Sequence, residues 1–232
     1  MTDMGFGMKK TVVCLLGILL FCRAELSAQG YFLEKQDMKL EYVRTYVADG
    51  RFRWRHVMNV KSRTDNGYYI RYVTESLFTG KNGKPLYRST VNETTLMDKA
   101  SGDISLDVAD AMVSYIKART GLNATSSGVL SSLPSGIQPG DTLPPVSAQA
   151  KVGPFTYSLL ISERKVLRKE TIEVPAGKFE CIVVSERKVE SGPGHNRSVT
   201  NYTWYSKGVG YVRHDTYVKG KPETTEILQS IH

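Results

Sequence analysis

The sequence predicts an all-β protein whose strands form a large antiparallel meander, either a barrel or a strongly curved, partly closed sheet. The clearest evidence is the segment Phe52–Val60, where apolar residues alternate with basic and polar ones at the period of a half-buried strand. The turn pairs Asp49-Gly50 and Asn66-Gly67 flank this segment and favour hairpins. Similar segments recur to give about a dozen strands, and open sheets of that size tend to curl or close. A two-sheet sandwich is the alternative.

The first half of the chain is expected to hold successive strands at 40–47, 52–61, 68–79, 86–96 and 104–106. β-branched and aromatic residues are frequent in these ranges, and such residues fit a pleated, half-buried surface. Turn-forming residues rich in Gly, Asn and Asp separate the strands at 48–50, 65–67, 80–84 and 101–103. The regular spacing of these turns is typical of a barrel or a sandwich.

The middle of the chain departs from the strand pattern. Apolar residues in 108–120 recur at roughly helical spacing, which predicts a short helix or an irregular connection. The residues that follow, near 121–145, are rich in Ser, Gly and Pro and predict a long connection, either a lid or a crossover.

Strands are expected again at 146–152, 155–162, 166–174, 180–190, 196–206, 210–218 and 223–231. Turns containing Gly and Pro separate the later ones, at 191–194 and 219–222. Nearly all the expected strands follow one another locally, so the central connection divides the chain without dividing the fold. Residues 29–232 are therefore expected to form a single β-rich domain.

The N-terminus has the pattern of a secretory signal peptide over residues 1–28. Two lysines precede a mostly apolar stretch that is too short to span a bilayer, and Ala28 offers a small residue for cleavage. We therefore expect a periplasmic or secreted protein with no transmembrane segment in its mature chain. A lipoprotein acylated at Cys22 is the alternative, which Phe21 disfavours because lipid attachment needs a small residue before the cysteine.

Cysteine content and charge narrow the expected surroundings. Of the three cysteines only Cys181 lies beyond the predicted signal peptide, so we expect no internal disulfide and a buried, apolar role for this thiol. The net charge of +8 favours anionic neighbours such as phospholipid headgroups, lipopolysaccharide or acidic glycans. Export argues against a nucleic-acid partner. The densest basic feature is the row Arg51, Arg53 and Arg55, which we expect on the outward face of its strand.

The sequence offers little support for catalysis. The segments 162–165 and 185–188 match Ser-x-x-Lys, but that spacing brings Ser and Lys together on a helix, and both copies lie in predicted strands. The four histidines lack metal-ligand spacing. We therefore expect no enzyme activity, no cofactor and no bound metal, with a hydrolase as the least favoured alternative.

Three residues are candidates for contact with a ligand: Trp54, His56 and Trp204. A barrel of about a dozen strands is wider than side chains readily fill, so aromatic residues on its strands are expected to line an apolar pocket. His56 lies on the apolar face of its predicted strand, where a histidine is more often a hydrogen-bonded core residue than a ligand-binding one. In an open interior it would instead supply a polar group.

Two C-terminal segments carry a family resemblance: VPAGKFEC at 174–181 and WYSKGVG at 204–210. With other positions between Arg164 and Leu228, their order and spacing resemble the TapB-like family, a domain-of-unknown-function group of exported all-β bacterial proteins. The resemblance implies an envelope location and a large β-barrel-like fold. The family has no assigned catalytic residues, so the resemblance implies none here.

The functional prediction is a non-catalytic exported envelope protein that binds an apolar or amphiphilic ligand, such as a lipid, in a β-barrel-like cavity. Strand number, aromatic content and the flexible central connection favour this interpretation. The alternative is a structural or interaction module of the cell envelope that binds a protein or an anionic glycan through its sheet surface or edge.

Overall fold

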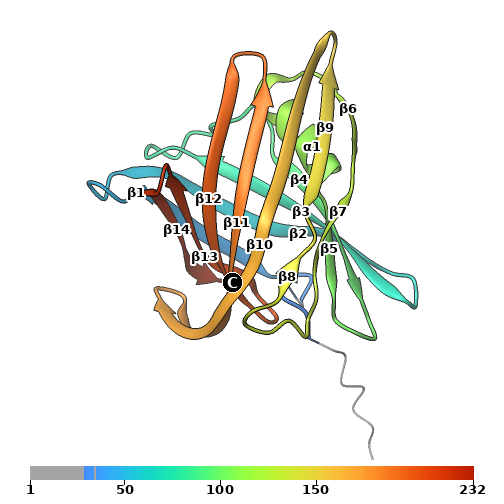
Figure 1. The fold of residues 1–232 in the computed structure, drawn as a ribbon, viewed down its shortest axis with the longest axis vertical. Helices are drawn as coiled ribbons and strands as arrows, with labels where there is room; N and C mark the ends of the chain where they lie inside the picture. Colours follow the sequence, from blue (N-terminus) through green and yellow to red (C-terminus); the bar gives the residue numbers. More distant parts are fainter. Residues whose placement is uncertain (1–28, 34) are drawn as a thin grey trace, which may run out of the picture.

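The computed structural model describes residues 29–33 and 35–232, so the predicted signal peptide and Cys22 lie outside the described residues. The described chain forms one antiparallel sheet of 14 strands with one helix packed beside it (Figure 1). In chain order the elements are β1 (Lys39–Tyr46), β2 (Phe52–Asp65), β3 (Tyr69–Thr79), β4 (Val91–Asp98), β5 (Ile104–Asp107), α1 (Val108–Thr120), β6 (Thr125–Gly128), β7 (Leu130–Leu133), β8 (Thr142–Leu143), β9 (Val146–Val152), β10 (Phe155–Val174), β11 (Gly177–Gly192), β12 (His195–Ser206), β13 (Gly210–Val218) and β14 (Lys221–Ile231).

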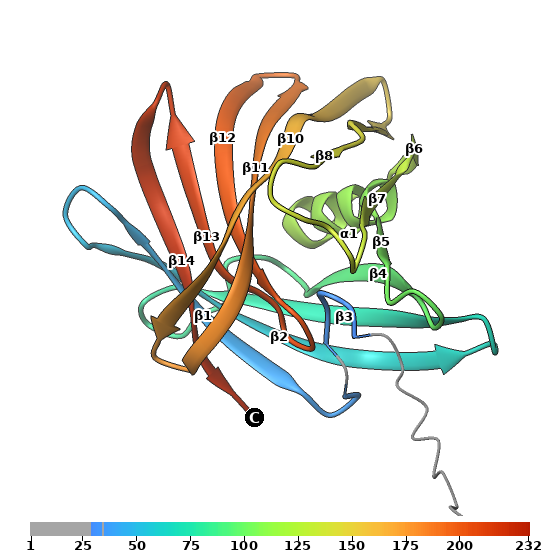
Figure 2. The same ribbon diagram turned by 60° about the horizontal axis from the view of Figure 1, so that its bottom comes forward.

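The sheet is a nearly closed barrel. Its strands follow the order β6-β9-β10-β11-β12-β13-β14-β1-β2-β3-β4-β5-β7, and β8 pairs with β10 beside this path. The first strand, β1, pairs with both β2 and the last strand, β14. The long strands curve around a common interior (Figure 2). The predicted all-β barrel is therefore confirmed, and the two-sheet sandwich does not apply.

The two ends of the strand path are consecutive in sequence. Only Val129 separates β6, which pairs with β9, from β7, which pairs with β5. One extended segment thus spans the gap between the two edges. We call this junction between the two edges the seam. Arg164 of β10 stabilises it, because its guanidinium donates to the carbonyl oxygens of Pro144 at 3.0 Å and Ser132 at 3.3 Å. The segment near 121–145, predicted as a connection, contains β6, β7 and β8.

The structure joins two predicted strands, 155–162 and 166–174, into the single strand β10. A β-bulge interrupts its register between Ser162 and Lys165, and Glu163 has a φ of 52°. The bulge leaves Arg164 buried and close to the seam. The Ser-x-x-Lys segment therefore lies in a bulged strand. One predicted strand is shorter than expected, since β4 begins only at Val91.

The predicted helix forms α1, and both of its ends are capped. Asp107 accepts a hydrogen bond from the backbone N–H of Asp110 at 2.9 Å, and Gly121 ends the helix with a φ of 80°. Val108 packs with Val146 of β9 in a buried cluster, so the helix lies against the sheet. No helix within residues 29–33 and 35–232 is long and apolar enough to cross a membrane.

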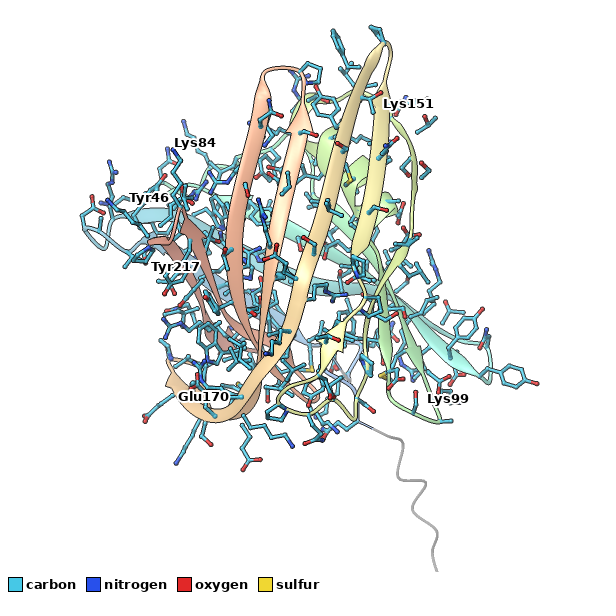
Figure 3. The ribbon with its side chains drawn as sticks, in the orientation of Figure 1. Tyr46, Lys84, Lys99, Lys151, Glu170 and Tyr217 are labelled. Carbon is cyan, nitrogen blue, oxygen red and sulfur yellow. The ribbon has the colours of Figure 1, made fainter. Side chains whose placement is uncertain are left out.

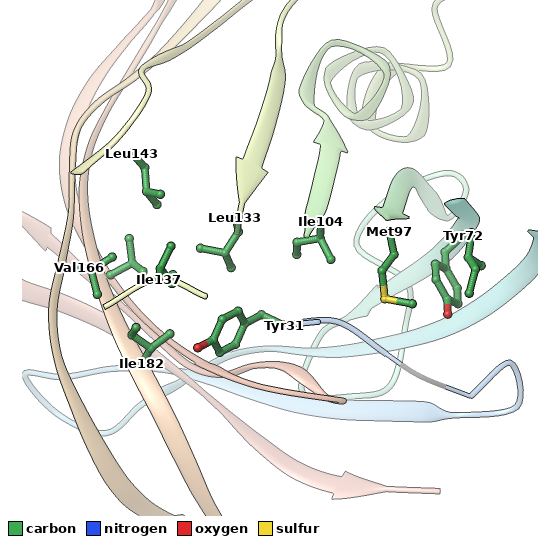
Figure 4. Packing of buried hydrophobic residues seen from close by; sticks show 11 residues of the cluster. Tyr31, Tyr72, Met97, Ile104, Leu133, Ile137, Leu143, Val166 and Ile182 are labelled. Carbon is green, nitrogen blue, oxygen red and sulfur yellow. The ribbon is translucent and has the colours of Figure 1, made fainter. Parts of the chain in front are cut away.

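Packed apolar side chains fill part of the barrel interior (Figure 4). The cluster comprises Tyr31, Ile70, Tyr72, Met97, Ile104, Leu133, Ile137, Leu143, Val166, Ile182 and Val184. The N-terminal segment passes through it so closely that a Cβ on Gly30 would lie 2.5 Å from the carbonyl oxygen of Gly102. Dense packing of this kind leaves little free space. The polar part of the interior lies elsewhere.

Candidate functional site

The inner faces of β1, β2, β13 and β14 carry a group of polar and aromatic side chains that we call the inner cluster. Its members are Tyr42, Arg44, Trp54, His56, Tyr211, His214 and Glu226. The strand register brings them together: Arg44 lies opposite both Trp54 and Glu226, and Glu226 lies opposite His214. Residues directly opposed across an antiparallel pair share one face of the sheet, so these four side chains face the interior together.

A buried ion pair lies at the centre of the inner cluster. Arg44 Nη2 is 2.9 Å from Glu226 Oε2, and the indole N–H of Trp54 donates to Glu226 Oε1 at 2.9 Å. Burial by itself favours the neutral form of Glu226, but Arg44, His56 and the Trp54 hydrogen bond outweigh it and hold its pKa below the ordinary value. The guanidinium carbon of Arg44 also lies 4.9 Å from the Trp54 ring centroid. The carboxylate is therefore charged and fully engaged.

His56 is buried and hydrogen-bonded through both ring nitrogens. Nδ1 lies 3.0 Å from the Tyr211 hydroxyl, and Nε2 lies 2.9 Å from Ser76 Oγ of β3. The imidazole stacks between Tyr42 and Phe78, with centroid separations of 5.3 Å and 4.4 Å. Burial lowers its pKa to about 4, against the opposing pull of nearby Glu226. His56 is therefore neutral at pH 7, and it is both a satisfied core residue and a part of the polar interior.

A β-bulge in β13 positions two further members of the inner cluster. The register between β12 and β13 shifts after Trp204, so Tyr211 pairs with Tyr205, and its ring stacks on Tyr42 at 4.4 Å. His214 Nδ1 lies 2.9 Å from Thr203 Oγ1. Burial lowers the pKa of His214 to about 3, so this second imidazole is also neutral at pH 7.

Water reaches part of this interior. Tyr211, His214 and Glu93 of β4 each keep partial solvent exposure. Burial nevertheless raises the pKa values of Tyr211 and Glu93 and lowers that of His214. Glu93 alternates with the buried Thr95 and Met97 along β4, so its carboxyl group faces inward. These three side chains are therefore shielded from bulk solvent without being fully excluded from it.

Of the three predicted contact residues, the structure brings Trp54 and His56 together and separates Trp204 from them. Trp204 follows Thr203, whose hydroxyl meets His214 in the interior, and successive strand residues point to opposite faces. Trp204 therefore lies on the outer face, where its indole N–H bonds to Glu170 on the curled end of the β10–β11 hairpin (Figure 3).

The outer face around Trp204 is itself covered. The guanidinium carbons of Arg168 and Arg213 lie 6.0 Å and 4.7 Å from its ring centroid. Cys181 and Trp204 belong to one buried cluster, which extends as far as Leu40, Tyr42 and Met58 of β1 and β2. Cys181 is buried as expected for an apolar thiol, and burial raises its pKa to about 12. This arrangement holds the hairpin against the barrel wall.

The inner cluster combines aromatic and polar groups. It offers aromatic rings for stacking, two neutral imidazoles, a tyrosine hydroxyl and one buried ion pair. Within the part of the chain that the structure describes, no three or more His, Cys, Asp or Glu side chains are grouped so as to hold a metal ion.

Sequence reasoning missed most of the inner cluster. Arg44 lies between Tyr42 and Tyr46 at the inward positions of β1, so extending the strand alternation by one residue would have placed a charge inside. Its partner Glu226 is 182 residues away, and no local pattern links the two. The position of Tyr211 depends on a β-bulge in β13, and the local sequence has no feature that predicts this bulge.

Comparisons with known proteins agree on the fold. Two solved structures are similar: a predicted exported protein with a YMCC-like fold from Bacteroides fragilis NCTC 9343, at 19% identity and a TM-score of 0.70, and a predicted lipoprotein from Parabacteroides distasonis ATCC 8503, at 16% identity and a TM-score of 0.72. Each alignment covers 88% of this chain and 99% of the other. A comparison with curated proteins found no match.

A family model extends across most of the sequence. The model described as DUF3108-like matches residues 37–226, from just before β1 into β14. The match supports the expected uncharacterised all-β family, although it does not confirm the TapB-like name. The chain belongs to the DUF3108-like family.

Proposed function

We propose that this protein is a non-catalytic envelope protein that binds an amphiphilic ligand, such as a lipid, inside its barrel. The observation that carries the proposal is the inner cluster, which combines aromatic rings and fixed polar groups on a face that water reaches. Binding sites for small molecules typically pair apolar or aromatic walls with a few placed polar groups that set orientation. The inner cluster has both components.

The apolar component is a continuous run of rings along the interior. Tyr211 stacks on Tyr42, His56 stacks on Phe78, and the centroid of Phe78 lies 5.3 Å from that of Tyr87, which precedes β4. Aromatic rings supply a large contact area with few rotatable bonds, so they lose little entropy when they hold a ligand. Tyr211, Phe78 and Tyr87 keep partial solvent exposure beside the buried Tyr42 and His56, so a hydrocarbon or ring system laid along this run would contact these three rings.

The polar component explains why we propose an amphiphile rather than a purely apolar ligand. Glu93, Tyr211 and His214 keep partial solvent exposure, so an apolar molecule placed against all three would strip water from them without replacing its hydrogen bonds. A ligand with a polar end avoids that cost. The similar structures, one named as a predicted exported protein and one as a predicted lipoprotein, support a periplasmic or secreted location together with the predicted signal peptide.

A second candidate function is that of an interaction module of the envelope. A shallow groove with a volume of about 610 Å³ crosses the outer face of β6, β9, β10 and β11. Leu160 lies in it and is 44% exposed, beside Ser147, Ser158 and Gln149. Leu159 and Val189 also line the groove, and such a mixed surface of apolar and small polar residues fits a protein or glycan contact of modest affinity.

The experiment that tests ligand binding uses the two tryptophans as reporters. The chain has only two, so Trp204→Phe leaves Trp54 inside the barrel and Trp54→Phe leaves Trp204 on the outer wall. We would titrate each variant with 1-dodecanoylglycerol, an uncharged single-chain amphiphile, below its aggregation limit. Solvent extraction of the purified protein, followed by mass spectrometry, would identify any lipid already bound.

Saturable change of Trp54 emission, with Trp204 emission constant, is the expected result. Equal responses from both reporters would indicate adsorption to the surface and would contradict an interior site. No response from either reporter, together with an extract free of stoichiometric lipid, would overturn the carrier function and favour the outer-groove alternative.

A further inference from the structure

A pocket lies between two hairpin turns at the edge of the barrel, and we call it the turn pocket. It has a volume of about 290 Å³ and is lined by the β1–β2 turn and the β13–β14 turn: Tyr46, Ala48, Asp49, Arg51, Val218, Lys221, Pro222 and Glu223. Sites for drug-sized ligands start near 300 Å³, so the turn pocket suits one small group rather than a whole lipid.

Positive charge predominates around the turn pocket. The guanidinium carbons of Arg51 and Arg53 lie 5.1 Å and 5.4 Å from the Tyr46 ring centroid, so two cations approach one aromatic ring. Lys221 adds a third cation and, like Arg51, lines the pocket directly. Arg197 of β12 adds a fourth, through its contact with Glu223.

The lining itself pairs two cations, Arg51 and Lys221, with two carboxylates, Asp49 and Glu223, so the excess of positive charge comes from Arg53 and Arg197 beside the pocket. Glu223 contacts Arg197 and lies 4.0 Å from Arg53, so one carboxylate is shared by two guanidinium groups. Asp49 lies 3.4 Å from Arg51 and also accepts the backbone N–H of that residue at 3.0 Å. The pocket therefore keeps donors and positive charge for an added anion, and guanidinium groups match carboxylate and phosphate oxygens in pairs.

Arg53 connects the turn pocket to the inner cluster. The basic row was expected on the outward face, but the register between β1 and β2 shifts after Arg44, and Arg53 is the extra residue. Its guanidinium carbon lies 4.4 Å from the Trp54 ring centroid as well as over Tyr46, and its side chain is only 27% exposed. The bulge therefore turns Arg53 away from the outward face on which it was expected. The Arg53 side chain lies between Trp54 of the inner cluster and Tyr46 of the turn pocket.

We propose that the turn pocket binds the anionic group, a phosphate or a carboxylate, of the amphiphile whose apolar part lies along the inner cluster. This inference rests on the proposed function, and it adds the ligand class: an anionic amphiphile held by its charged end between the two turns. A lipid headgroup and a free phosphate present the same chemistry, so the experiment includes both.

The test compares two ligands that differ by one phosphate. We would measure the dissociation constants of 1-dodecanoylglycerol and of 1-dodecanoylglycerol 3-phosphate with the Trp204→Phe protein, by Trp54 emission and by calorimetry. Glycerol 3-phosphate alone serves as the free anion. The test variant is Arg51→Gln/Lys221→Gln, and both residues are exposed, so folding should be retained. Circular dichroism and unfolding curves would verify this.

The control variant, Lys151→Gln/Lys178→Gln, removes the same charge from exposed positions on β9 and β11. Lys151 lies far from Tyr46 in the molecule (Figure 3). The phosphorylated ligand is expected to bind about tenfold more tightly than the uncharged one, a preference that the test variant loses and the control keeps.

Each other outcome has a distinct meaning. Equal affinity for the two amphiphiles would overturn the anion site while leaving the carrier function intact. Binding of glycerol 3-phosphate alone, lost in the test variant, would support the turn pocket as an anion site for a free phosphate and would overturn the lipid source. Binding of none of the three would overturn both proposals.

Discussion

Lowering the pH from 7 to 5 is expected to weaken the folded state, because His56 and His214 are held neutral inside the barrel. Burial lowers their pKa values to about 4 and about 3, against about 6.5 in an unfolded chain. Below pH 6.5 the unfolded chain therefore binds more protons than the folded one, and stability falls with pH. The loss levels off only below the folded pKa values.

The size of the effect follows from proton linkage. Between pH 7 and pH 5 each histidine contributes a loss of about 2 kcal/mol, so the pair contributes about 4 kcal/mol. That is a large part of the 5–15 kcal/mol that typically stabilises a domain. Carboxylates with lowered pKa values, such as Glu226, add their losses mainly below pH 5. Glu93 acts in the opposite direction, because its raised pKa lets the folded state gain a proton as pH falls.

Urea unfolding followed by circular dichroism at pH 7, 6 and 5 measures this dependence. His214→Gln and His56→Gln should each be less stable at pH 7, and each should lose about half of the pH dependence. Glu93→Gln should steepen the dependence, since it removes the opposing group. A free energy of unfolding that stays constant from pH 7 to pH 5 in the unmodified protein and in Glu93→Gln would refute the reasoning.

Three further predictions concern packing. Gly30→Ala should lower the free energy of unfolding by about 1–3 kcal/mol and reduce Tm, because the new Cβ would lie 2.5 Å from the Gly102 carbonyl oxygen. The control Gly136→Ala, whose Cβ would have no atom within 4 Å, should leave Tm unchanged. Arg164→Met should lower the free energy of unfolding by about 3 kcal/mol or more and speed amide hydrogen exchange in β7, since it removes the buried guanidinium that holds the seam. Unchanged exchange in β7 would contradict this role. Cys181, whose pKa burial raises to about 12, should react with a thiol reagent only after denaturation. Rapid labelling of the folded protein would show that the packing around Cys181 and Trp204 is open.

The sequence predicted the strands well where alternation and turn residues agreed. The ranges of β9 and β13 match the prediction residue for residue, and α1 begins and ends where the helical spacing does. The barrel followed from strand number, since so many locally connected strands must curl or close. Closure through β6 and β7 was not predictable in the same way, because short Ser- and Gly-rich strands resemble loops in composition.

The candidate site was predictable only in part. His56 and Trp54 follow from the alternation of β2, because both lie on its apolar face. The rest depends on bulges and on distant pairing: Arg53 turns toward Trp54 because of a register shift, and Trp204 was assigned to the interior because nothing local distinguishes the two faces of β12. Where a strand is buried on both faces, apolar residues occupy both, so the sequence does not show which face is the interior.

The pairing of β1 with β14 determines when the protein can fold. Leu40 lies opposite Ile231, and Lys39 and His232 exchange two backbone hydrogen bonds of 2.9 Å, so β1 cannot complete its pairing before β14 has been synthesised. Contacts between residues so far apart in sequence form slowly, and β1 and β13 each keep an unpaired edge until β14 has been synthesised. A chain truncated before Lys221 would leave β1 and β13 as long open edges, which favour association between copies over folding of one.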